Sequence, residues 1–145
     1  MSFSTLLWYS DLSLSLNRKN NEKKAKIEVD NVANRFPTEI GDVSRVVRDI
    51  ASLWLDNPKA FNFPEILHFS AAQRMTKYDM AVKFAEILGV PSNHLVKLDE
   101  IDESTTVRRP LNAQLDVGRL RELGINTQTV DFESWWRRRL GAFRH

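Results

Sequence analysis

The chain has 145 residues, of which 42% are hydrophobic and 28% charged, and its formal net charge is +2. This is the size of one domain and the balance of an ordinary globular protein, which argues against two full domains and against a disordered chain. The sequence has no apolar run of about 18 residues and so excludes a membrane-spanning helix. We therefore predict a cytoplasmic protein that folds around one core.

The counts of glycine, cysteine and histidine exclude several kinds of site. The five glycines are scattered, so neither a G-x-G-x-x-G loop nor a P-loop is present to bind phosphate. The absence of cysteine excludes disulfides and thiolate metal sites, and the three histidines do not form a metal-binding pattern. Neither G-x-S-x-G nor Tyr-x-x-x-Lys occurs. The sequence thus predicts no catalytic residue, no metal and no cofactor bound by this chain alone.

Charge is distributed unevenly along the chain. Residues 17–26 carry five basic residues and one acid, residues 27–105 carry eight basic residues and 13 acids, and residues 106–145 carry eight arginines and four acids. Nucleic-acid binding is one interpretation of the basic segments. Because no DNA- or RNA-binding motif accompanies them, a solvated surface is the favoured interpretation and no nucleic-acid partner is predicted.

We divide the chain into an N-terminal segment, residues 1–24, which shows no clear structural pattern, and a domain at residues 25–145. The first predicted elements lie at the start of this domain. Alternation predicts a strand at Ala25–Val29, and the proline after Phe36 predicts extended chain over Arg35–Ile40. Apolar residues at helical spacing then predict a helix from Asp42, as its N-cap, to Leu55.

The middle of the chain predicts a strand, a helix and a second strand. Ile66–Ser70 is a candidate strand. Thr76 and Asp79 form a capping box before a helix that runs from Lys77 to Leu88, where Gly89 ends it. Leu95–Leu98 is the second strand, and the acidic loop that follows it lacks the spacing of a calcium site.

Two short helices are predicted near the C-terminus, at Asp116–Leu123 and at Asp131–Leu140, the second with Asp131 as its cap and an aromatic buried face. Of the histidines, His68 and His94 are expected to be one buried and one surface residue. Strands that alternate with helices predict an α/β fold, or α+β for this chain taken alone, with too few strands for a full doubly wound sheet.

Candidate binding residues cluster in the extended stretch before the first of these two helices. Arg108, Arg109, Asn112 and Gln114 provide two guanidinium groups and two amides, a combination suited to an anionic substrate. Alternation would turn Asn112 and Gln114 to one side of the stretch and its leucines to the other. The alternative is that these polar groups only tie a loop to neighbouring backbone.

Four motifs in register resemble a known family. They are Arg109-Pro-Leu-Asn-Ala-Gln-Leu-Asp116, Arg35-Phe-Pro-Thr38, His68-Phe-Ser70 and Met75-Thr-Lys-Tyr-Asp-Met-Ala81. Together they resemble the dTDP-4-dehydrorhamnose reductase-like branch of the extended short-chain dehydrogenases. Within that branch they are most similar to the regulatory β subunits of methionine adenosyltransferase.

The resemblance implies a two-part fold, in which a Rossmann half binds NAD or NADP and a smaller C-terminal half binds substrate. This sequence matches only the C-terminal half, so the resemblance implies that the glycine-rich Rossmann half is absent and that one face of the 42–55 helix is left exposed. It also implies a non-catalytic regulatory protein that binds the catalytic subunit of methionine adenosyltransferase. The tail would dock there through Phe143, Arg144 and His145, although a frayed terminus is an equal alternative.

The alternative function, of a different class, is a fragment of an NAD(P)-dependent sugar-nucleotide reductase similar to dTDP-4-dehydrorhamnose reductase. In that case Arg108, Arg109, Asn112 and Gln114 would form the anion side of the substrate pocket.

Overall fold

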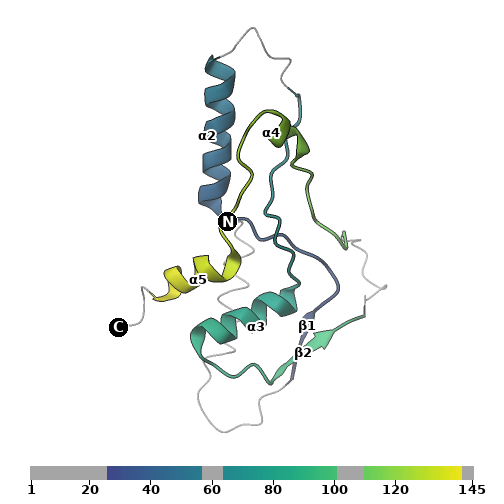
Figure 1. The fold of residues 1–145 in the computed structure, drawn as a ribbon. Coiled ribbons are helices and arrows are strands. Elements are labelled where there is room, and N and C mark those ends of the chain that lie inside the picture. The colour runs from purple at the N-terminus through teal and green to yellow at the C-terminus, as the bar shows by residue number, and fades with distance from the viewer. Residues whose placement is uncertain (1–25, 57–63, 101–109, 142–145) are drawn as a thin grey trace.

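A computed structural model describes residues 26–56, 64–100 and 110–141. Their elements, in chain order, are β1 (Ile27–Asp30), α2 (Ile40–Asp56), α3 (Lys77–Leu88), β2 (Leu95–Leu98), α4 (Gly118–Glu122) and α5 (Phe132–Gly141) (Figure 1). This mixture of helices and strands is compatible with the predicted α/β class. None of the helices in this part of the chain combines the length and the apolar character needed to cross a membrane. The 1–24 segment lies outside the described residues.

The two strands pair in parallel, with Ile27 opposite Leu95 and Asp30 opposite Leu98. Helix α3 precedes β2 and contacts both strands, and α5 packs on α3. Figure 1 shows these four elements together in the lower half of the molecule. We call β1, β2, α3 and α5 the sheet region.

The core of the sheet region is aromatic. The ring of Phe84 on α3 lies edge-on to Phe132 and Trp136 on α5, with centroid distances of 5.3 and 4.8 Å. All three side chains are buried, and Val29 of β1 and Leu95 of β2 join the same cluster. The predicted aromatic face of the last helix is confirmed, and it holds α5 against α3.

The predicted ends of α3 are also confirmed. The Thr76 hydroxyl accepts a hydrogen bond from the Asp79 N–H at 3.0 Å, and the Asp79 carboxylate accepts from the Thr76 N–H at 2.9 Å. At the other end Gly89 has φ 66°, a left-handed conformation that glycine adopts without strain. Both signals are local in sequence, which is why the sequence alone predicted them.

A second hydrophobic cluster is formed by α2, α4 and the chain next to them. We call this part of the molecule the helix region. Val46 of α2 packs with Leu120 of α4 and with Ile125, and the half-buried Leu67 and Phe69 complete the cluster. Gly124 has φ 74° and lets the chain turn back immediately after α4. Helix α4 begins at Gly118 and is shorter than the predicted 116–123 helix, because the Asp116 carboxylate accepts from the Gly118 N–H in a turn.

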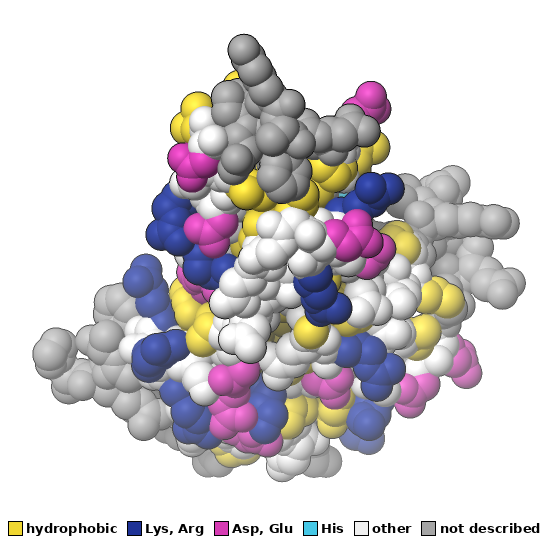
Figure 2. Space-filling view, turned by 45° about the horizontal axis from the view of Figure 1, so that its top comes forward, with side chains coloured by type: hydrophobic (Ala, Val, Ile, Leu, Met, Phe, Trp, Pro, Cys, Tyr) yellow, Lys and Arg dark blue, Asp and Glu magenta, His cyan; other side chains and the backbone are white. Residues whose placement is uncertain are grey.

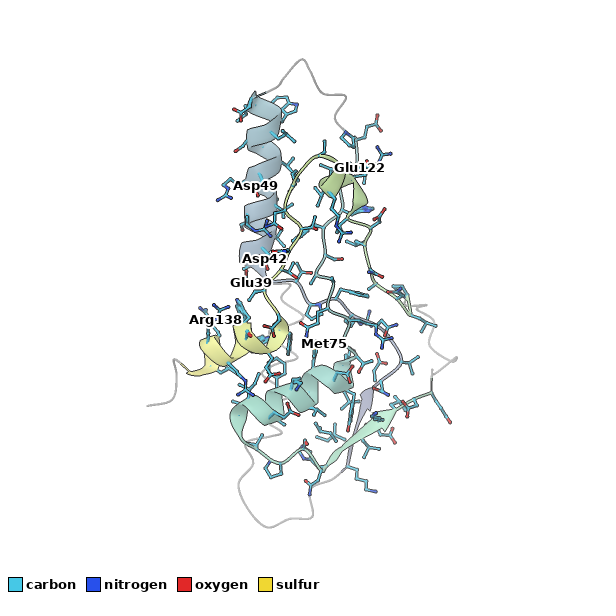
Figure 3. The ribbon with its side chains drawn as sticks, in the orientation of Figure 1. Glu39, Asp42, Asp49, Met75, Glu122 and Arg138 are labelled. Carbon is cyan, nitrogen blue, oxygen red and sulfur yellow. The ribbon has the colours of Figure 1, made fainter. Side chains whose placement is uncertain are left out.

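The start of α2 differs from the prediction. The helix begins at Ile40, and the Glu39 carboxylate accepts a hydrogen bond from the Asp42 N–H at 2.9 Å. Asp42, predicted as the N-cap, instead accepts from the Val130 N–H at 2.9 Å through its own carboxylate. Figure 3 shows Glu39 and Asp42 together at the lower end of the helix. The prediction was wrong because Asp42 is used in a contact that is remote in sequence.

The strand predicted at 66–70 is wrong. This segment is extended but makes no ladder with a neighbour among the described residues. Leu67 and Phe69 face the helix-region cluster, while Ile66 is 68% exposed. Alternating side chains therefore reflect one buried side, without the paired backbone that defines a strand. Of the two histidines, His94 is buried and His68 is exposed.

Candidate functional site

The described part of the candidate binding stretch, residues 110–116, runs beside the chain that follows β1. Asn112 forms a parallel bridge with Asn34. The Asn34 N–H donates to the Leu111 carbonyl at 2.7 Å, and the Ala113 N–H donates to the Asn34 carbonyl at 3.3 Å. Backbone pairing thus fixes where Asn112 and Gln114 lie.

The side chains of this stretch are more exposed than the sequence suggested. The Asn112 carboxamide oxygen accepts from the Gln114 N–H at 3.1 Å, so part of Asn112 stabilises a local turn. Both amide residues are exposed, but so are Leu111 and Leu115, at 50% and 42%. Exposure therefore does not distinguish the leucines of this stretch from its two amides. Arg108 and Arg109 lie outside the described residues.

The four motifs that carried the resemblance meet around this stretch. The backbones of Arg35 and Met75 exchange two hydrogen bonds, of 2.8 and 2.9 Å. The Thr38 hydroxyl accepts from the Ala71 N–H at 3.0 Å, and the Ser70 hydroxyl accepts from the Leu115 N–H at 3.3 Å. Met75 is labelled in Figure 3 at the start of α3, where these chains converge. We call the paired segments 34–38, 70–76 and 111–116 the motif junction.

Polar groups at the edge of the motif junction are held by short contacts. The Asn31 amide donates to the Asp99 carboxylate at 2.6 Å and accepts from the Thr76 hydroxyl at 3.2 Å. Burial favours the neutral form of Asp30, but hydrogen bonds from the N–H groups of Ala33 and Val32, together with the positive charges of Lys77 and Arg35, outweigh it, so the pKa of Asp30 is lowered. Asp30 is therefore held as a carboxylate that orders the turn after β1.

The described residues offer no metal site. Within 26–56, 64–100 and 110–141, no three histidine or acidic side chains lie close enough together to ligate an ion. The described part of the C-terminal region ends with α5, whose Leu140 packs against the sheet-region core. Phe143, Arg144 and His145 follow it and lie outside the described residues. A docking tail would therefore follow a helix that is fixed to the core.

Sequence reasoning missed the contacts that join the helix region to the start of α5. One guanidinium nitrogen of Arg45 donates to the Asn126 carbonyl at 2.7 Å, and the other donates to the Gln128 carbonyl at 2.6 Å. Together with the contact between Asp42 and Val130, these bonds hold residues 126–130 along α2. We call this set of contacts the α2 clamp. The sequence did not indicate this role of Arg45, because the two carbonyls that it binds lie more than 80 residues away.

Comparisons with known proteins identify the family of this chain. The RmlD substrate binding domain matches residues 11–143. Methionine adenosyltransferase 2 subunit beta of Danio rerio is 36% identical over 117 residues, which are 81% of this chain and 35% of that protein. The Bos taurus protein of the same name is 39% identical over 103 residues, which are 70% of this chain and 29% of that protein.

The chain thus spans about a third of the length of the curated relatives it matches. The match to the domain covers all four motifs and every described element, from β1 to α5. On this basis the chain belongs to the RmlD substrate binding domain family and is similar, over most of its length, to the beta subunits of methionine adenosyltransferase 2.

Proposed function

We propose that this chain acts as a non-catalytic regulatory subunit that binds the catalytic subunit of a methionine adenosyltransferase. The observation that carries the proposal is the 36% identity to a subunit beta over 81% of the chain. The same proposal includes a cytoplasmic location and no NAD or NADP bound by this chain alone. It treats residues 25–145 as the functional domain.

The proposed docking element is the tail, with Phe143 as its apolar anchor and Arg144 and His145 as its polar end. An aromatic side chain that enters a pocket on a partner contributes much of the affinity of an interface. The edge-on contacts of Trp136 with Phe84 fix the helix from which the tail leaves. A fixed exit reduces the entropy lost when the tail binds.

Co-purification of the full chain with a methionine adenosyltransferase catalytic subunit tests this proposal. The double variant Phe143→Ala/His145→Ala should bind about tenfold more weakly or worse. These positions are preferable to a deletion from Leu140, because Leu140 packs against the core and its loss would disturb the fold. Glu122→Ala, on the exposed surface of α4, is the matched control and should bind normally.

Two outcomes would contradict different parts of the proposal. Unchanged binding by the tail variant would remove the docking role of the tail. Failure of the unmodified chain to bind the catalytic subunit would remove the regulatory role itself.

A second candidate function is favoured by the substrate-binding family to which the chain belongs. In this alternative the chain is part of an NAD(P)-dependent reductase of the dTDP-4-dehydrorhamnose type. Arg108 and Arg109 would then bind the phosphates of a sugar nucleotide next to the exposed amides of Asn112 and Gln114.

Calorimetric titration with a dTDP-sugar separates the two functions. Binding that is lost in Arg108→Ala/Arg109→Ala and kept in Arg119→Ala, on α4, would support the reductase alternative. Absence of heat at millimolar ligand would eliminate it.

A further inference from the structure

Helix α2 carries an apolar surface that the described residues leave open. Ile40, Val47 and Trp54 are 53%, 58% and 54% exposed. They recur every seven residues and, with the exposed Ala51, form one stripe along the helix. Leu55, beside it, is 67% exposed. We call these five residues the outer stripe.

The outer stripe is distinct from the face that α2 buries. Val46 is buried against Leu120, and Ile50 and Leu53 pack on the same cluster. Because a helix turns 100° per residue, Val46 and Val47 point to neighbouring sectors, one inward and one outward. In the space-filling view, hydrophobic side chains, coloured yellow, are exposed near the upper end of the molecule (Figure 2). Aligned exposed apolar residues on a helix mark a surface that is covered by something else.

We propose that the N-terminal segment of this same chain, residues 1–16, binds the outer stripe. Nine of these 16 residues are apolar and Asp11 is the only charged one, so the segment can be buried with little loss of charge hydration. The proposal is independent of the regulatory function, because it concerns a contact within one chain.

The length of the chain before β1 allows this contact. Residues 17–25 are mostly basic and polar, which suits a hydrated connection, and they can span about 30 Å at about 3.3 Å per residue. Helix α2 has 17 residues and is about 25 Å long. The connection is therefore longer than the helix along which residues 1–16 would bind.

The size of the stripe favours a tethered occupant over a second copy of the chain. A stable dimer buries about 800 Å² on each partner, more than one face of a single helix of this length provides. A tethered segment binds at an effective concentration of about millimolar, so a small apolar surface is sufficient. Arg48 lies at the border of the stripe, and its charge is opposite to that of Asp11. Arg48 also pairs with the adjacent Asp49, but this exposed ion pair is weak and would compete little with a contact to Asp11.

The absence of cysteine makes a direct test possible. Val47→Cys places the sole thiol of the full chain in the stripe, and its rate of reaction with a maleimide reports whether the stripe is covered. Replacing Leu6, Leu7 and Trp8 by serine should increase that rate about tenfold or more, because the cover is lost. Ser52→Cys, on an exposed sector of the same helix away from the stripe, should react at one rate in both backgrounds.

Two further measurements keep the test decisive. Asn20→Ser/Asn21→Ser in the connection is the matched control and should leave the thiol of the Val47→Cys variant protected. A bismaleimide should join Leu7→Cys to Val47→Cys within one chain, and should fail to join Leu7→Cys to Ser52→Cys. This cross-link is made with the apolar segment otherwise intact, so it remains informative if the triple serine variant does not fold.

Three results would overturn the proposal. The first is a fast reaction of the thiol at position 47 in both backgrounds. The second is protection that is unaffected by the serine substitutions, which would assign the cover to another segment. The third is protection that is lost on dilution together with cross-linked dimers, which would assign the stripe to a second copy.

Discussion

The sheet region and the helix region bury their helices differently. In the sheet region, α3 lies between the strand pair and α5, and Phe84 contacts aromatic rings of α5. In the helix region, α2 is buried along Val46 and exposed along Val47. Helix α3 is stabilised by the apolar surface that it buries on two sides, whereas α2 keeps exposed apolar side chains that another segment can cover. The sheet region therefore covers its central helix on two sides, whereas the described residues leave one side of α2 uncovered.

The largest expected effect comes from removing the central ring of the sheet region. Phe84→Ala should lower the free energy of unfolding by about 4 kcal/mol, because it creates a cavity between α3 and α5. Phe84→Leu, which keeps much of the volume, should cost about 1.5 kcal/mol or less. Urea denaturation measures both values. Equal losses for the two variants would contradict this explanation, because they would mean that the volume of the cavity does not set the cost.

Leu120→Ala tests the core of the helix region in the same way. Its side chain is 0% exposed, and its removal should cost about 3 kcal/mol. Leu111→Ala removes the same atoms from a residue that is 50% exposed and should cost less than about 0.5 kcal/mol. Tryptophan fluorescence, followed during unfolding in variants that keep only Trp54 on α2 or only Trp136 on α5, also shows whether the two regions respond together. Separate transitions would show that the two regions unfold independently.

Breaking the α2 clamp should have a smaller effect that reaches both regions. Arg45→Ala removes two hydrogen bonds to the carbonyls of residues 126 and 128 and should cost about 1.5 kcal/mol. Arg48→Ala is the control: its side chain is 70% exposed and pairs with the adjacent Asp49 on the surface, so the change in stability should be close to zero. Hydrogen exchange of the 126–130 amides should increase in the first variant alone. An equal response from both variants would contradict the clamp.

The smallest expected effect is a dependence of stability on acid. The pKa of Asp30 is lowered in the folded state, so its contribution to stability is present above the ordinary carboxyl pKa of about 4 and is lost as the pH falls below it. The pKa values of Asp131 and Glu133 are also lowered, mainly by Ser134 and Arg137 respectively, and add to the same loss. Asp30→Asn should therefore reduce, without abolishing, the decrease in stability between about pH 5 and pH 3. Parallel curves for the two proteins would show that Asp30 is not involved.

The candidate site was predictable only in part. The sequence singled out the Arg108–Asp116 stretch and the three other motifs, and the structure brings their described parts together at one junction. The roles of Thr38 and Ser70 were not predicted, because each hydroxyl is bonded to a segment that is 33 or 45 residues away. The sequence also did not indicate that Leu111 and Leu115 are exposed. Alternation predicts which side chains lie on the same side of an extended segment, but it does not predict whether other parts of the chain pack against that side.

By itself the sequence determined the features whose causes are local. The capping box and Gly89 set the ends of α3, helical spacing set the apolar arc of α2, and the motifs in order identified the family. Only the tertiary structure decided which part of that arc is buried, where Asp42 and Arg45 find their partners, and that residues 66–70 lack a paired strand within the described chain. The physical reason is that caps and turns are stabilised by neighbours within a few residues, whereas burial and pairing depend on segments that meet only after the chain has folded.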